Sequence, residues 1–141
     1  MYKKILVPTI DLKRSEKPLR EAIRLANLLG WDTRITVLHV NPVPIFDQES
    51  LFLDFLANLE EVGRSILRSI EPLLAEAQIA HESVSVTGDP AYTIYSKANS
   101  EKYDLLVIGK RRQNSVVRFF RGSISQTILQ EARCPILQVP E

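Results

Sequence analysis

The residues of this sequence best suited to bind a ligand lie between Gly109 and Ser123. The stretch leaves an apolar run, crosses a polar segment and enters a predicted helix at Ser123, which has capping-box spacing to Gln126. A helix start presents free N–H groups and a positive partial charge, which suit an anionic group such as a phosphate. Gly122 would let a ligand approach the backbone closely, because glycine carries no side chain.

Basic side chains gather in the same stretch. It contains five basic residues and no acidic one: Lys110, Arg111, Arg112, Arg118 and Arg121. The whole chain has a formal net charge of +1, so the remaining residues sum to −4. Taken alone, these residues support two hypotheses about equally. One is a phosphate-binding site, and the other is a solvated basic loop beside a well-capped helix.

Asp11 is the second candidate. It follows the first apolar run, and its carboxylate could accept hydrogen bonds from a ribose or a base amino group. A turn or helix-entry aspartate is the alternative. In doubly wound sheets, ligands bind at the carboxyl ends of strands where the winding reverses. If the strands before Asp11 and Gly109 are neighbours, both residues face one crevice.

Other chemical signatures are missing. No GxGxxG follows the first apolar run, and the chain has neither a GxxxxGK[ST] loop nor a GxSxG turn. His39 is expected to be a packed histidine, and Cys134 a small buried hydrophobic residue. Since no nucleophile–base pair or carboxylate pair is evident, the sequence gives no indication of hydrolysis by a dedicated catalytic set and favours binding over catalysis.

Hydrophobic periodicity predicts the elements that must position these residues. Continuous apolar runs at 5–7 and 104–109 are typical of strands buried on both faces, whereas alternation at 82–86 indicates a strand near a sheet edge. Further strands are predicted at 35–40 and 134–139, and helices at 15–29, 49–78, 90–100 and 123–133. This order implies an α/β fold in three layers, a doubly wound, five-stranded parallel sheet with the 5–7 and 104–109 strands adjacent at its centre.

Particular residues are expected to mark the helix ends. Ser15 is the predicted N-cap of the first helix, and Asp89 caps the third helix with Pro90 at its first position. Gly63 and Pro72 would bend or interrupt the long second helix.

Length and composition limit the function classes. The 141 residues correspond to a single domain, 1–141, and 45% hydrophobic with 25% charged residues is ordinary for a soluble globular protein. The near-neutral charge gives no argument for nucleic acid or membrane binding, and no apolar stretch approaches the ~20 residues of a membrane span. One cysteine excludes an intrachain disulfide and fits a reducing compartment, so a cytoplasmic location is expected.

From end to end, the chain resembles the universal stress protein family. The resemblance is carried by Ile5-Leu6-Val7-Pro8 followed by Asp11, Gly88-Asp89-Pro90, the strand into Gly109, Gly122-Ser123 and Cys134-Pro135-Ile136-Leu137. The ATP-binding branch of that family has a glycine, two residues, a second glycine, nine residues and Gly-Ser or Gly-Thr. The spacing from Gly109 to Gly122-Ser123 fits, but Arg112 replaces the second glycine, and one residue is inserted before Asp11.

The resemblance implies an adenine-nucleotide alpha-hydrolase-like fold with sheet order 3-2-1-4-5 and the switch point between strands 1 and 4. It also implies a homodimer formed through the last strand, around 136–139. In the nucleotide-binding branch, the adenosine would face Asp11 and the backbone near Val40, with Pro8 in the same set. The ribose and phosphates would contact Gly109, Gly122, Ser123 and Ile124. The implied ligand is ATP or a related adenine nucleotide, which Mg²⁺ could accompany.

Arg112 leaves the function open. Its guanidinium could contact a phosphate directly, or its side chain could fill the site and abolish binding. The favoured hypothesis is a cytoplasmic, homodimeric stress-response protein that binds an adenine nucleotide. The alternative is a dimeric interaction protein of the same fold that binds no nucleotide, with partner proteins that the sequence does not identify. Nucleic acid binding is the weakest hypothesis, because Phe119 and Phe120 are the only aromatic residues in the basic stretch.

Overall fold

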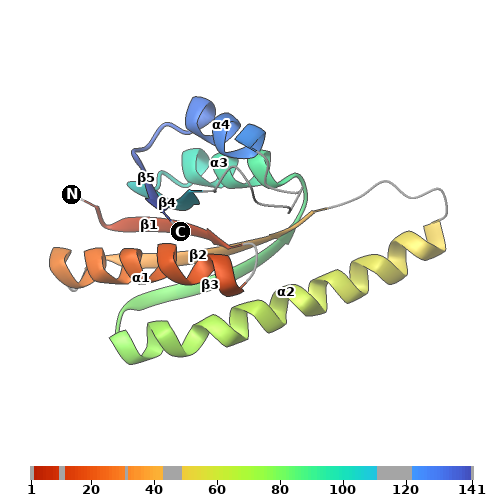
Figure 1. Ribbon diagram of the computed structural model, residues 1–141, viewed down its shortest axis with the longest axis horizontal. Helices are drawn as coiled ribbons and strands as arrows, with labels where there is room; N and C mark the ends of the chain where they lie inside the picture. The colour runs from red at the N-terminus through yellow and green to blue at the C-terminus, as the bar shows by residue number, and fades with distance from the viewer. Residues whose placement is uncertain (1, 10–11, 31, 43–48, 111–121, 141) are drawn as a thin grey trace.

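The architecture is a parallel sheet between two layers of helices (Figure 1). The computed structural model describes residues 2–9, 12–30, 32–42, 49–110 and 122–140, and every structural statement refers to these. Within them, five parallel strands follow the order β3-β2-β1-β4-β5, which confirms the predicted doubly wound fold. The elements are β1 (Lys4–Thr9), α1 (Leu12–Leu29), β2 (Arg34–Asn41), α2 (Glu49–Ala77), β3 (Ala80–Thr87), α3 (Pro90–Ser100), β4 (Leu105–Lys110), α4 (Gly122–Glu131) and β5 (Ile136–Pro140).

The centre of the sheet is formed by β1 and β4, as the two continuous apolar runs predict. Ile5 pairs with Leu105 and Leu6 with Leu106, while β1 pairs with β2 over six positions. Ile5 and Leu6 are fully buried, because helices cover both faces of these strands. The predicted adjacency of the two strands is therefore confirmed.

Alternate residues of each strand face two separate cores. One core packs beneath α1 and α2, which lie together on one side of the sheet, and the other packs beneath α3 and α4 on the opposite side (Figure 1). On the strands, the first core is formed by Ile5, Val7, Ile35, Val37, Leu105 and Val107, and the second by Leu6, Leu38, Val40, Leu106 and Ile108.

The sheet edges are β3 and β5. The sequence of β3 alternates polar and apolar residues, and Glu82 and Ser83 are exposed. The prediction of an edge strand from this alternation is confirmed. No helix among the described residues is long and apolar enough to cross a lipid bilayer.

Of the three predicted helix caps, one is confirmed. Asp89 caps α3 as expected: its Oδ2 accepts a hydrogen bond from the Tyr92 amide at 2.9 Å, and Pro90 is the first helical residue. The prediction for Ser15 is wrong, since α1 begins at Leu12 and Ser15 is a buried residue within the helix. The predicted N-cap Ser123 is likewise the second residue of α4, which begins at Gly122.

The long helix α2 runs unbroken from Glu49 to Ala77, so the predicted interruption at Gly63 or Pro72 is wrong. Gly63 instead marks a close approach to the sheet. A Cβ built there would stand 2.8 Å from Asn41 Oδ1 and 2.9 Å from His39 Cδ2. The missing side chain therefore lets α2 lie directly on the ends of β2 and β3.

We expect Gly63→Ala to destabilise the protein by roughly 1–3 kcal/mol, because overpacking against buried groups outweighs the better helix propensity of alanine, about 1 kcal/mol. Asn58→Ala is the control, because Asn58 is an exposed residue of the same helix. That change should stabilise by at most about 0.7 kcal/mol. Urea denaturation measures both. A stabilising Gly63→Ala would contradict the close approach.

Candidate functional site

The carboxyl ends of the parallel strands lie along one edge of the sheet. Thr9 ends β1 and pairs with His39, and β2 continues two residues further to Asn41. Gly109, near the end of β4, pairs with Val139 of β5. The ends of β1 and β2 are therefore paired neighbours, and the end of β4 lies along the same edge of the sheet, where it pairs with β5.

The ladder between β1 and β4 is short. Its two register pairs involve Ile5 and Leu6 of β1, whereas β1 and β2 stay paired up to Thr9. Pro8 has no N–H to donate to a ladder. The chain leaves β1 into α1 on one side of the sheet and enters α4 on the other. This is the topological switch point, where doubly wound sheets bind ligands beyond the strand ends.

The structure brings most of the predicted site residues to this edge. Pro8 is partly buried in β1, Val40 is 2% exposed on the α3 side of β2, and Gly109 is exposed. Gly122, Ser123 and Ile124 are the first three residues of α4. Ile124 packs against the second core. Two further candidates, Asp11 and Arg112, lie outside the described residues.

The direction of α4 decides whether its start lies near Gly109. The helix ends at Glu131, and β5 begins at Ile136, which pairs with Leu106 towards the amino edge of the sheet. Therefore α4 runs back from the carboxyl edge of the sheet, the edge at which β4 ends. No acidic side chain occupies the first turn of α4, which leaves its positive end suited to an anion.

A separate groove of about 560 Å³ lies between α1 and α2. It is lined by Arg20, Ile23, Arg24, Asn27, Leu28, Leu73, Glu76 and Ala77. None of the predicted site residues belongs to this lining, so the groove is distinct from the switch point.

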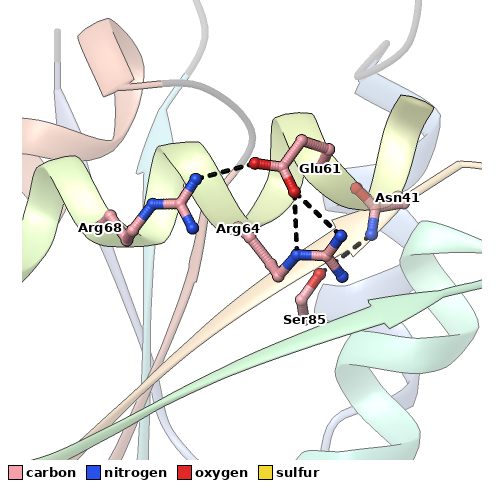
Figure 2. A network of polar contacts seen from close by, with 5 residues as sticks. All are labelled: Asn41, Glu61, Arg64, Arg68 and Ser85. Atoms are coloured by element: carbon pink, nitrogen blue, oxygen red, sulfur yellow. Dashed lines mark hydrogen bonds and ion pairs between the residues drawn. The ribbon is translucent and has the colours of Figure 1, made fainter. Parts of the chain in front are cut away.

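A buried polar cluster lies at the same strand ends and was not predicted from the sequence. Thr9, His39 and Asn41 are 1%, 4% and 1% exposed on the face covered by α2. Thr9 Oγ1 lies 3.4 Å from His39 Nδ1, and Asn41 Nδ2 donates to Ser85 Oγ at 3.0 Å. Figure 2 shows Asn41 and Ser85 pointing toward each other below α2. The sequence signal was available, since polar residues end two otherwise apolar strands.

Burial shifts the pKa of His39 at this edge and that of Cys134 at the opposite, amino edge of the sheet. Burial lowers the pKa of His39 from its ordinary 6.5, against the opposing effects of the Asn41 side chain and the Thr9 backbone, so the imidazole is neutral at pH 7. The expected packed state of His39 is confirmed. Burial likewise raises the pKa of the partly buried Cys134 thiol, which packs against the second core. Among the described residues, no group of three His, Cys, Asp or Glu side chains gathers as metal ligands would.

Comparison of the sequence with known proteins identifies its family. The profile of the universal stress protein family matches residues 1–140. Universal stress protein YxiE of Bacillus subtilis is 28% identical over 149 residues, covering 99% of this chain and 99% of YxiE. A universal stress protein of Thermus aquaticus is 33% identical over 124 residues, covering 84% of this chain and 85% of its own length.

Solved structures share the fold. The structure of MJ0577 superposes with a TM-score of 0.85 at 23% identity, covering 100% of this chain and 97% of its own. A family protein from Arabidopsis thaliana, solved with AMP bound, gives a TM-score of 0.69 at 21% identity, with 99% and 92% coverage. A universal stress protein in complex with cAMP gives 0.72 at 19% identity, with 98% and 97% coverage.

The two histidines should give opposite pH dependences of stability. The lowered pKa of His39 means that the unfolded chain binds the proton first, so stability is lost as pH falls below 6.5. The pKa of His81 is raised: its burial lowers it, but hydrogen bonds to the Ile79 carbonyl and to Glu71 prevail. Its contribution is complete below 6.5 and is lost as pH rises through the folded-state pKa.

We therefore expect His39→Gln to flatten the fall in unfolding free energy between about pH 7 and 5.5, and His81→Gln to steepen it. Urea denaturation at several pH values measures both slopes. An unchanged slope in His39→Gln would show that His39 is not held neutral.

Proposed function

This chain belongs to the universal stress protein family, and from that membership we propose that it is a regulatory protein that binds ATP or a related adenine nucleotide at the switch point between β1 and β4. The observation that carries the proposal is the pairing of two features at one sheet edge. Gly109 is exposed near the end of β4, and α4 begins on the same side without an acidic first turn. Two structural neighbours hold AMP and cAMP on this fold, which supports an adenine nucleotide as the ligand class.

The two parts of the nucleotide would contact different strands. Pro8 and the backbone of β2 near Val40 are suited to the adenosine, with Asp11 as a further hydrogen-bond acceptor. The backbone N–H groups of Gly122, Ser123 and Ile124 are suited to phosphate oxygens, because they lie in the unpaired first turn of α4. Gly109 leaves room for the ligand beside β4. We assign any Mg²⁺ to the phosphate oxygens of the nucleotide.

We propose binding without dedicated turnover as the activity. A hydrolase would need a base within reach of the attacking water. His39 is neutral, but it is 4% exposed and packs beneath α2, on the face opposite Val40. Any ATP hydrolysis would then be slow. A protein of this kind would signal through nucleotide occupancy, and its single cysteine fits the cytoplasm.

One observation favours a second candidate function. Arg112 replaces a glycine of the family's nucleotide motif. If its side chain fills the site, the protein is a dimeric interaction protein that binds no nucleotide. The same residue could instead donate a charge-assisted hydrogen bond to a phosphate.

Calorimetry with ATP separates these functions. Arg112→Ala should weaken binding by roughly 1.5–3 kcal/mol if the guanidinium contacts a phosphate. Arg112→Gly should strengthen binding if the natural side chain blocks the site. Arg24→Ala is the charge-matched control, because Arg24 is an exposed residue of α1, and it should leave ATP affinity unchanged. Absence of heat with millimolar ATP in the natural protein and both Arg112 variants would exclude the nucleotide function.

We also propose a homodimer through β5. This strand is a sheet edge with partly exposed apolar residues, Ile136, Leu137 and Val139, and such an edge tends to pair. Gln138→Lys would place like charges near one another in a two-fold pairing and should raise the dimer dissociation constant. Ser83→Lys, an exposed change on the other edge, should not. Sedimentation equilibrium measures both. A monomeric natural protein at tens of micromolar would refute the dimer.

A further inference from the structure

A line of polar side chains crosses three strands beneath α2. Thr9 of β1, His39 and Asn41 of β2, and Ser85 of β3 all lie on the face that α2 covers. Thr9 and His39 are direct register partners, and the Asn41 carbonyl accepts from the Gly88 amide at 3.0 Å. The line therefore links the carboxyl ends of all three strands.

The buried amide of Asn41 is the least satisfied member. Its Nδ2 donates to Ser85 Oγ at 3.0 Å, but its Oδ1 has no donor within hydrogen-bond distance among the described residues. That oxygen and His39 Cδ2 lie 2.8 Å and 2.9 Å from one point, the position of a Cβ on Gly63. The imidazole edge and the amide oxygen thus both face the backbone of α2 at Gly63.

Two neighbouring residues influence the neutral imidazole. Thr9 Oγ1 lies 3.4 Å from Nδ1, and a hydroxyl can either donate to that nitrogen or accept from it. The Thr9 backbone and the Asn41 side chain both oppose the lowering of the His39 pKa by burial. We call this line of contacts the relay: Thr9 contacts His39, His39 neighbours Asn41 on the same strand, and Asn41 donates to Ser85.

The same backbone segments carry the proposed adenosine contacts on their other face. Val40 lies between His39 and Asn41 and packs into the second core, and Pro8 directly precedes Thr9. Building on the proposed nucleotide function, we propose that Thr9, His39 and Asn41 are positioning residues for the nucleotide site. They fix the ends of β1 and β2, and so the places of Pro8 and Val40, from beneath the sheet.

Three variants test this relay. His39→Leu removes both ring nitrogens, His39→Gln keeps an N–H donor and an acceptor, and Thr9→Val removes only the hydroxyl. His81→Leu is the matched control, because His81 is the other histidine in this sheet and bonds to Glu71 at 2.5 Å near the opposite ends of the strands. Thr9→Val keeps the side-chain volume, so it reports on the relay even if His39→Leu fails to fold.

Three measurements are made on the whole chain. Hydrogen–deuterium exchange without nucleotide should accelerate at the amides of residues 9 and 38–41 in His39→Leu and Thr9→Val, but not in His39→Gln or His81→Leu. Calorimetry should show ATP affinity reduced about tenfold in His39→Leu, with His39→Gln within about threefold of the natural protein. The unfolding free energies of the variants, from urea denaturation, should not follow the same order as their exchange rates and ATP affinities.

The outcomes keep this inference apart from the proposed function. If the natural protein binds no ATP, the nucleotide function fails, and local exchange alone decides whether the relay fixes the strand ends. If the natural protein binds ATP and His39→Leu binds it equally well with unchanged exchange, positioning is overturned. Exchange that accelerates evenly over the sheet, or equally in His81→Leu, would show a purely structural contribution and would also overturn it.

Discussion

The fold depends on burying β1 and β4 side by side with both faces covered. Parallel crossovers are right-handed, so the connection from β1 to β2 and the connection from β4 to β5 must pass over opposite faces. This constraint puts α1 with α2 on one side and α4 with α3 on the other (Figure 1). It also makes the chain diverge beyond the central strands, where the β1–β4 register pairs end at Leu6 and Leu106. The position of the candidate site thus follows from the opposite directions in which the chain crosses over from β1 and from β4.

The two ends of the sheet differ in how well their polar groups are hydrogen-bonded. At the amino end, Asp104 Oδ2 accepts from the amides of Lys3 and Lys4 at 3.0 and 2.8 Å, and Tyr103 donates to Thr36 at 2.9 Å. At the carboxyl end, Thr9 Oγ1 and His39 Nδ1 are 3.4 Å apart, and Asn41 Oδ1 has no donor within the part of the chain that the structure describes. An unsatisfied buried polar group costs about 1–3 kcal/mol, so an apolar cluster there would be more stable. The end of the sheet that carries the candidate site therefore has the less favourable polar contacts, a pattern typical of regions where function competes with stability.

The sequence predicted the fold because its strongest signals were strand burial and strand order. The runs around Ile5 and Leu106 could only be strands covered on both sides, and the alternation around Ser83 marked an edge. Helix starts were less predictable. Ser15 has cap chemistry but is buried within α1, and tertiary packing overrode the local preference. The relay beneath α2 was not predictable, since Thr9 and Ser85 are 76 positions apart and only strand register brings them to one line.

A comparison of α3 with α4 shows which of the two helix starts suits the proposed phosphate. Both helices cover the same face of the sheet. The start of α3 is already neutralised by its own chain, because Asp89 accepts from the Tyr92 amide, and an approaching phosphate would meet that carboxylate. In α4 the first turn has no acidic residue and follows a stretch with five basic ones. The charge pattern thus disfavours a phosphate at the start of α3 and favours one at the start of α4, where we propose that it binds. In the proposed complex, the uncharged adenosine would contact the β2 backbone near Val40, whose own side chain is buried in the second core. The difference in charge between the two helix starts would then orient the nucleotide.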